Sequence, residues 1–235
     1  MRGIGRENID RWFYNNLDVD NRTLYVGSTT TDTEGGESGV DYEMAEYLIK
    51  GLHVLESKSD KPITIIMNNP GGDWYHGMAI YDAIKNSPTE ITIKVYGQVM
   101  SMGTIILQSA TKRILQPNSR FMIHYGYNGF FGHSKSFERW GEENKRMAHV
   151  MENIYLDKIM EKDKTWGIKH MVEAFQLILN KVSDTPTEGL VFSRKGETRK
   201  EEYRKILKDL LNFDTILTPE ETISIGLGDE IYSKY

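Results

Sequence analysis

The chain contains no cysteine among its 235 residues. Disulfide bonds, thiolate nucleophiles and cysteine-based zinc sites are therefore excluded. The chain also lacks any apolar run close to the about 18 residues that a membrane-spanning helix needs. Residues 1–10 lack the apolar centre of a secretory signal peptide. The sequence thus predicts a protein that does not bind a membrane, and the missing cysteine agrees with a cytoplasmic location.

An excess of basic charge is missing as well. The formal net charge is −5 at pH 7, and this gives no reason to expect a nucleic-acid partner. The apolar content is ample by contrast, because 39% of the residues are hydrophobic and can build a sizeable core. Such a composition is not that of a disordered chain. We expect residues 1–235 to form a single domain, since the length fits one large domain.

Strand-like and helical patterns alternate along the first half of the chain. The expected strands cover residues 23–26, 63–67, 91–96 and 120–124. The helices expected between them cover residues 42–55, with Asp41 as N-cap, then a segment that reaches Ile84, and residues 104–109. Strands and helices that alternate at this spacing predict βαβ units and a parallel sheet, which places the chain in the α/β class.

The second half is expected to be mainly helical. A long polar helix over residues 134–162 carries a thin stripe of apolar residues, which favours a helix that projects and packs against another subunit. Three further helices and a last strand are expected at residues 166–181, 198–212, 219–226 and 230–232. Thr218 and Glu221 form the pattern of a capping box before the third of these helices.

The first candidate site segment is Asn-Asn-Pro-Gly-Gly at residues 68–72, directly after an expected strand. Glycines let the backbone approach a ligand closely and adopt unusual dihedral angles. Their N–H groups could then bind a developing oxyanion, and loss of one such donor typically costs about 3–4 kcal/mol of transition-state stabilisation. Taken alone, the segment is more often a simple turn between a strand and a helix.

The second segment is Gly-Gln-Val-Met-Ser-Met-Gly at residues 97–103, which places Ser101 between a strand and a helix. A serine there has its hydroxyl exposed at the carboxyl edge of the sheet, and the Met102 N–H would point to the same oxyanion position as the glycine amide. The commoner role of such a serine is only to cap the helix. The pattern is not the Gly-x-Ser-x-Gly turn of α/β-hydrolases, because Val99 stands two residues before the serine.

The third segment is Arg-Phe-Met-Ile-His at residues 120–124. Its last residue, His124, follows Ser101 by one crossover connection and could lie beside it. A lone histidine at the end of a strand is usually structural, and only the company of a serine and backbone donors makes it a candidate base. Asp214 could orient it, with Asp209 and Asp229 as alternatives, because sequence does not measure which carboxylate reaches the imidazole. The other histidines form no His-x-x-x-His pair, so no metal site is expected.

In this order the segments closely resemble the ClpP family of serine peptidases, the proteolytic subunits of Clp proteases. The family pattern reads Asn-Ser-Pro-Gly-Gly, then Gly-x-Ala-Ser-Met-Gly, then Pro-Asn-Ser-Arg-x-Met-Ile-His. The corresponding segments here are residues 68–72, 97–103 and 117–124, with further matches at residues 77–82 and 217–221. The resemblance covers roughly residues 10–162 and 198–232.

The resemblance implies a role for each matched residue. Ser101 would be the nucleophile, His124 the base and Asp214 the third member of a triad. The oxyanion donors would be the amides of Gly72 and Met102, and the residues that bind extended substrate would be Gly71, Tyr125 and Gly126. Such an enzyme needs no metal and no cofactor.

The resemblance also implies a fold and an assembly. The fold would be a crotonase-like spiral of ββα units with a protruding handle at about residues 125–162. Subunits of this kind form a homo-oligomer of two stacked heptameric rings, which encloses the active sites and degrades unfolded polypeptides. A separate AAA+ unfoldase supplies the substrate, and the present chain indeed has no Gly-x-x-x-x-Gly-Lys-Ser/Thr loop for a nucleotide.

Three features depart from the family pattern. Met100 replaces the small residue before the serine, and Tyr125 with Gly126 replaces the usual Gln-Pro after the histidine. The connection between His124 and Asp214 is longer than usual, and we expect its excess, about residues 163–197, to be a surface element. Two alternatives remain, namely a non-catalytic ring subunit and a crotonase-type acyl-CoA enzyme, although no glutamate acid/base or CoA pocket is evident for the latter.

Overall fold

A computed structural model describes residues 6–28, 38–127, 129, 132–182 and 190–233. The sequence also predicts a polar loop that reaches Gly35 and Gly36 and a break between helices at residues 184–189, and both lie outside these ranges. The chain divides into two compact units, the first made of Met1–Phe121 with Gly228–Tyr235 and the second of Met122–Leu227. No helix within the described ranges is long and apolar enough to span a membrane.

A sheet forms the centre of the first unit. Its strands follow the order β1 (Leu17–Asp18), β2 (Thr23–Val26), β3 (Ile63–Asn69), β4 (Ile91–Met100), β5 (Lys112–Leu115) and β8 (Glu230–Ile231). All neighbours pair in parallel except β1, which is antiparallel to β2. In the register, Ile65 lies between Leu24 and Ile93, and all three side chains are buried. The parallel sheet expected from the sequence is thereby confirmed.

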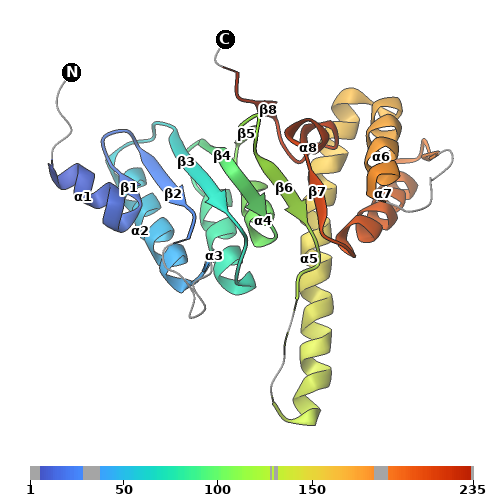
Figure 1. The fold of residues 1–235 in the computed structure, drawn as a ribbon, viewed down its shortest axis with the longest axis horizontal. Coiled ribbons are helices and arrows are strands. Elements are labelled where there is room, and N and C mark those ends of the chain that lie inside the picture. The colour runs from blue at the N-terminus through green and yellow to red at the C-terminus, as the bar shows by residue number, and fades with distance from the viewer. Residues whose placement is uncertain (1–5, 29–37, 128, 130–131, 183–189, 234–235) are drawn as a thin grey trace. The chain divides into compact units, whose positions relative to one another are not determined.

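Four helices complete the first unit: α1 (Arg6–Asn15), α2 (Tyr42–Lys58), α3 (Trp74–Lys85) and α4 (Met102–Leu107). Figure 1 shows α2, α3 and α4 side by side along the sheet. The carboxylate of Asp41 accepts a hydrogen bond of 2.9 Å from the Met44 N–H, which confirms the expected N-cap. Every residue of α4 is buried, so the helix that follows Ser101 is part of the core.

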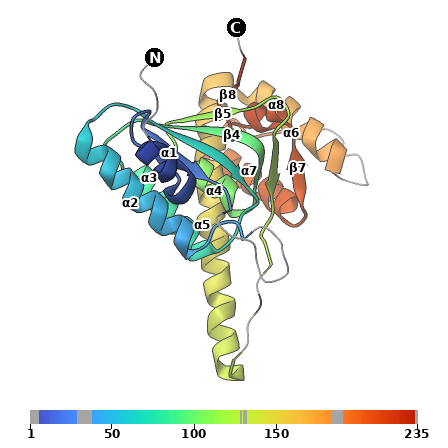
Figure 2. The ribbon, with the colours of Figure 1, turned by 60° about the vertical axis from the view of Figure 1, so that its left-hand side comes forward.

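The second unit is mainly helical. It contains the end of β6 (Arg120–Ile123), α5 (Ser134–Trp166), α6 (Ile168–Val182), α7 (Gly196–Leu211), β7 (Thr215–Leu217) and α8 (Pro219–Ser224). Strand β7 pairs with β6. The buried side chains of α5 begin only at Met151. Figures 1 and 2 accordingly show the first half of α5 clear of α6, α7 and α8, as expected for a projecting helix.

The excess residues between His124 and Asp214 are not only a surface element, and this expectation is corrected. The polar turn over residues 194–197 is exposed, but α6 buries Met171, Phe175 and Ile178 on one face. The Phe175 ring lies 5.5 Å from that of Tyr203 on α7. Apolar residues spaced three or four apart form a stripe that must pack against neighbours, so α6 belongs to the core of the second unit.

Candidate active site

Ser101 occupies a strained turn between β4 and α4. Its backbone has φ 50° and ψ −125°, in the positive-φ region that L-residues rarely adopt. Such a conformation costs on the order of 1–3 kcal/mol and occurs mostly at functional sites. The serine side chain makes no capping hydrogen bond to α4. Ser101 thus occupies the N-cap position of α4, but its side chain does not contribute the hydrogen bond by which a capping serine usually stabilises a helix.

Gly71 brings the backbone of the glycine segment directly against Ser101. A Cβ atom at Gly71 would lie 2.6 Å from the serine Cβ and 3.2 Å from its Oγ, and the φ of Gly71 is +109°. The next residue, Gly72, is held against Val40 and also has a positive φ, of +140°. Glycine is required at both positions, because any side chain would collide with its neighbours and the backbone would be strained.

Asn69 determines which amides of the glycine segment are available. Its side-chain NH2 donates to the Gly27 carbonyl at 2.7 Å, and its Oδ1 accepts from the Gly71 N–H at 2.9 Å. The Gly71 amide is thus occupied. Within the described residues, no acceptor is found for the N–H groups of Gly72 and Met102. These are the two amides that the family resemblance assigns to the oxyanion, and neither is engaged elsewhere in the described part of the chain.

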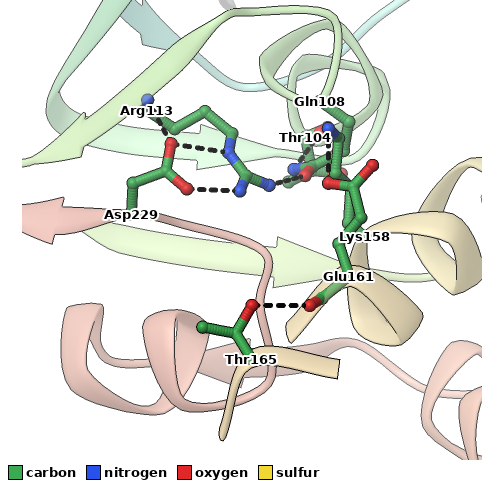
Figure 3. A network of polar contacts seen from close by, with 7 residues as sticks. All are labelled: Thr104, Gln108, Arg113, Lys158, Glu161, Thr165 and Asp229. Atoms are coloured by element: carbon green, nitrogen blue, oxygen red, sulfur yellow. Dashed lines mark hydrogen bonds and ion pairs between the residues drawn. The ribbon is translucent and has the colours of Figure 1, made fainter. Parts of the chain in front are cut away.

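A chain of hydrogen bonds holds α4 in place, as Figure 3 shows. The Thr104 hydroxyl donates to the Ser101 carbonyl at 2.5 Å, and the Gln108 amide donates to the Thr104 carbonyl at 3.1 Å. The buried guanidinium of Arg113 on β5 donates to Gln108 Oε1 and to Asp229, in both cases at 2.5 Å. The serine turn is thereby connected to β5 and to the C-terminal segment of the first unit.

His124 and Asp214 form a pair in the second unit. His124 directly follows β6 and Asp214 directly precedes β7, and these strands pair with each other. The imidazole Nδ1 lies 2.8 Å from the carboxylate Oδ1 of Asp214. A carboxylate at Nδ1 stabilises the tautomer whose other nitrogen, Nε2, can accept a proton.

The two rival aspartates have other positions. Asp229 lies in the first unit and pairs with Arg113, as described above. Asp209 lies within α7, five positions before Asp214. Among the three candidates, the structure therefore places Asp214 against the imidazole.

A pocket of about 340 Å³ lies beside this pair. Residues 124–127 and 211–214 line it, and it includes the exposed rings of Tyr127 and Phe213. The Tyr127 ring meets the imidazole edge-on, with centroids 5.8 Å apart. Gly126 has a φ of +81° and contributes backbone to the same wall. The lining of this pocket is mixed, with the aromatic rings of Tyr127 and Phe213 beside the polar groups of His124, Asn212 and Asp214.

Several residues that support the site were missed in the sequence. Asn69 was part of the recognised segment, and its position at the end of a buried strand was a signal that its amide must be satisfied inside the protein. Arg113 and Gln108 carried no such signal, because their partners are decided by packing. Glu152 accepts a hydrogen bond from Tyr125 and pairs with Arg204, but both residues lie in helices so rich in charged residues that no sequence pattern singled them out.

Comparison with known proteins agrees with these motifs. The family model of Clp protease matches residues 36–174. The ATP-dependent Clp protease proteolytic subunit of Deinococcus radiodurans is 27% identical over 97% of this chain and 87% of its own length. The ATP-dependent Clp protease proteolytic subunit 2 of Pseudomonas aeruginosa is 35% identical over 51% of this chain and 60% of its own length.

The fold is similar to that of a solved relative. A ClpP1 variant from Listeria monocytogenes superposes with a TM-score of 0.61 and 24% identity, covering 92% of this chain and 94% of the other. The fold is thus the α/β fold of ClpP, as predicted. Because the family model spans more than half of the sequence, the chain belongs to the Clp protease family. It is a protease of the ClpP type.

Proposed function

We propose that the chain is a serine endopeptidase subunit that cleaves unfolded polypeptides. Ser101 Oγ attacks the peptide carbonyl, and His124 Nε2 takes the serine proton and then donates it to the leaving amine. Asp214 orients the imidazole and stabilises its charged form. The amides of Gly72 and Met102 hold the oxyanion, and water releases the acyl-enzyme. The backbone groups of Gly71, Tyr125 and Gly126 are proposed to line the path of the extended substrate.

One observation carries this proposal. Ser101 adopts a strained positive-φ turn against the Gly71 backbone, and amides without an acceptor in the described chain flank it. A turn with only a structural role would relieve the strain with glycine and would not need a serine. In the proposed mechanism the His124–Asp214 pair supplies the base.

The proposal includes an assembly. We propose a homo-oligomer of two stacked heptameric rings in the cytoplasm, built from a single-domain subunit whose projecting α5 serves as the handle, and served by an AAA+ unfoldase. The names of the relatives, which are subunits of ATP-dependent proteases, support this. They do not favour a crotonase-type acyl-CoA enzyme. The positive-φ turn of Ser101 and the hydrogen-bonding distance between His124 and Asp214 argue against a non-catalytic ring subunit.

A fluorophosphonate probe tests the nucleophile. The probe should label the native protein at Ser101 alone, as read by intact mass and peptide mapping, and Ser101→Ala should remove both the labelling and peptide hydrolysis. Hydrolysis should fall by at least about 1,000-fold, since loss of a triad member removes most of the catalysis.

Ser57→Ala is the matched control, because Ser57 is exposed on α2 and its hydroxyl donates to the Val54 carbonyl of the same helix. This variant should label and hydrolyse like the parent. Peptide hydrolysis that persists in pure Ser101→Ala protein would disprove the assignment.

A further inference from the structure

We propose that Tyr125 is a positioning residue, which holds His124 and Asp214 together and is itself held by Glu152 of α5 and Arg204 of α7. This inference rests on the catalytic role proposed for the His124–Asp214 pair. Tyr125 departs from the family pattern, and α7 lies in the connection between His124 and Asp214, which is longer than usual.

Tyr125 contacts both segments that carry the pair. Its backbone follows His124 directly, and its N–H donates to the carbonyl of Leu211 at 2.8 Å. Leu211 is the last residue of α7, three positions before Asp214. Near the same point, the Thr215 hydroxyl donates to the Leu210 carbonyl at 2.7 Å. The end of α7 is thereby attached on one side to the histidine segment and on the other to the aspartate segment.

The tyrosine side chain is anchored in the opposite direction. Its hydroxyl donates to Glu152 Oε1 at 2.7 Å. Burial, together with this hydrogen bond to Glu152, raises the pKa of Tyr125 well above its usual value, so the hydroxyl stays a donor at any working pH. An anchored side chain of this kind restricts the backbone on which His124 sits.

Glu152 has a partner that keeps its charge in place. Its side chain is only 5% exposed, and Arg204 Nη1 donates to its Oε2 at 3.0 Å. The other arm of the Arg204 fork donates to Asn153 Oδ1 at 2.9 Å. A buried carboxylate needs such a partner, because unpaired burial of a charge is strongly unfavourable. Arg204, Glu152 and Tyr125 therefore form a continuous connection from α7 through α5 to the histidine.

The decisive variant is Tyr125→Phe, which removes the hydroxyl and keeps the ring. We expect kcat for a peptide substrate to fall about tenfold while KM stays unchanged, since small misplacement of a catalytic group costs this much or more. Tyr203→Phe is the matched control. Tyr203 is a fully buried tyrosine of α7 whose pKa is raised by burial and by the nearby Asp163 carboxylate of α5. This control should keep the parental kcat.

A double-variant test separates positioning from general stability. If Tyr125 acts through the pair, then Tyr125→Phe should cause no further loss in an Asp214→Asn background, because the imidazole is already without its carboxylate. A loss that multiplies with that of Asp214→Asn, or an unchanged kcat in the single variant, would overturn the inference.

Hydrogen–deuterium exchange tests the inference without any turnover. Peptides that cover residues 122–127 and 211–217 should exchange faster in Tyr125→Phe than in the parent, and not in Tyr203→Phe. Unchanged exchange in both peptides would contradict the inference. A parent protein that neither labels nor hydrolyses would count against the proposed function, and the exchange result would still decide the role of Tyr125.

Discussion

Gly71 shows how much of the site depends on the absence of one side chain. Its backbone passes so close to Ser101 that a methyl group has no room, and the obstructing atoms are the serine side chain and the Met100 carbonyl. The glycine segment and the serine turn can therefore be complementary only while residue 71 has no Cβ. The same reasoning applies to Gly72 against Val40.

We expect Gly71→Ala to lower the rate of fluorophosphonate labelling by about 100-fold, because the new methyl group displaces Ser101 from its turn. Labelling followed over time by intact mass measures this. Gly141→Ala is the control. Gly141 lies within helix α5, and a Cβ atom at this position would meet no atom within 4 Å.

The control should keep the labelling rate and should stabilise the helix by up to about 1 kcal/mol, because alanine has the higher helix propensity. Normal labelling in Gly71→Ala would show that the close approach has no part in activating the serine.

Helix α4 and strand β5 form the element that carries the nucleophile. The helix has only six residues and all of them are buried, so it depends on its surroundings rather than on its own helical stability. Arg113 provides the main polar connection, since its guanidinium reaches both Gln108, the C-cap of α4, and Asp229 of the C-terminal segment. The Arg113 side chain is 7% exposed, so its removal takes a largely buried, charged donor away from both partners.

Arg113→Met should lower the free energy of unfolding by about 2–4 kcal/mol, because the Asp229 carboxylate and the Gln108 amide lose a charged, largely buried partner. Urea denaturation measures the change. Lys112→Met is the matched control on the same strand. Lys112 pairs with Glu230 at 2.9 Å, but both side chains are about half exposed, and such pairs contribute less than about 1 kcal/mol.

Equal effects of the two substitutions would contradict the structural role of Arg113. A loss confined to Arg113→Met, with slower labelling of Ser101 in the folded variant, would show that the network also positions the nucleophile.

For the whole molecule, the proposed assembly depends on the exposed first half of α5. The first half of α5 buries none of its residues in the described chain and exposes Phe137 and Trp140, at 67% and 42%. Large exposed aromatic side chains on a projecting helix are typical of surfaces that bind another protein. In the proposed assembly this surface meets the second ring.

Native mass spectrometry should find about fourteen copies of the 27.1 kDa chain in the parent assembly. Replacing Phe137 and Trp140 together by glutamate should halve this mass, because charges would be buried between the rings. Leu177→Glu on α6 is the control, since this leucine is 64% exposed within the second unit. An unchanged mass in the double variant would exclude this surface from the ring contact.

Much of the fold and one half of the site could be predicted from the chain itself. Apolar strands followed by helices indicated the parallel sheet, because periodicity depends on residues close in sequence. The Ser101 turn and the glycine segment were recognisable for the same reason. The short elements α1, β1, β5 and β7 were not predicted. Strands β1, β5 and β7 have only two to four residues, which is too short to show a period. Helix α1 has a polar sequence that does not distinguish a helix from a loop.

The contacts between distant residues were decided only by the tertiary structure. His124 and Asp214 are 90 positions apart, and three aspartates were compatible with the sequence. The choice of Asp214 follows from the pairing of β6 with β7, and the occupation of the Gly71 amide follows from the folded position of Asn69. Local patterns determine secondary structure, whereas the partner of a buried polar group depends on which segments packing brings together.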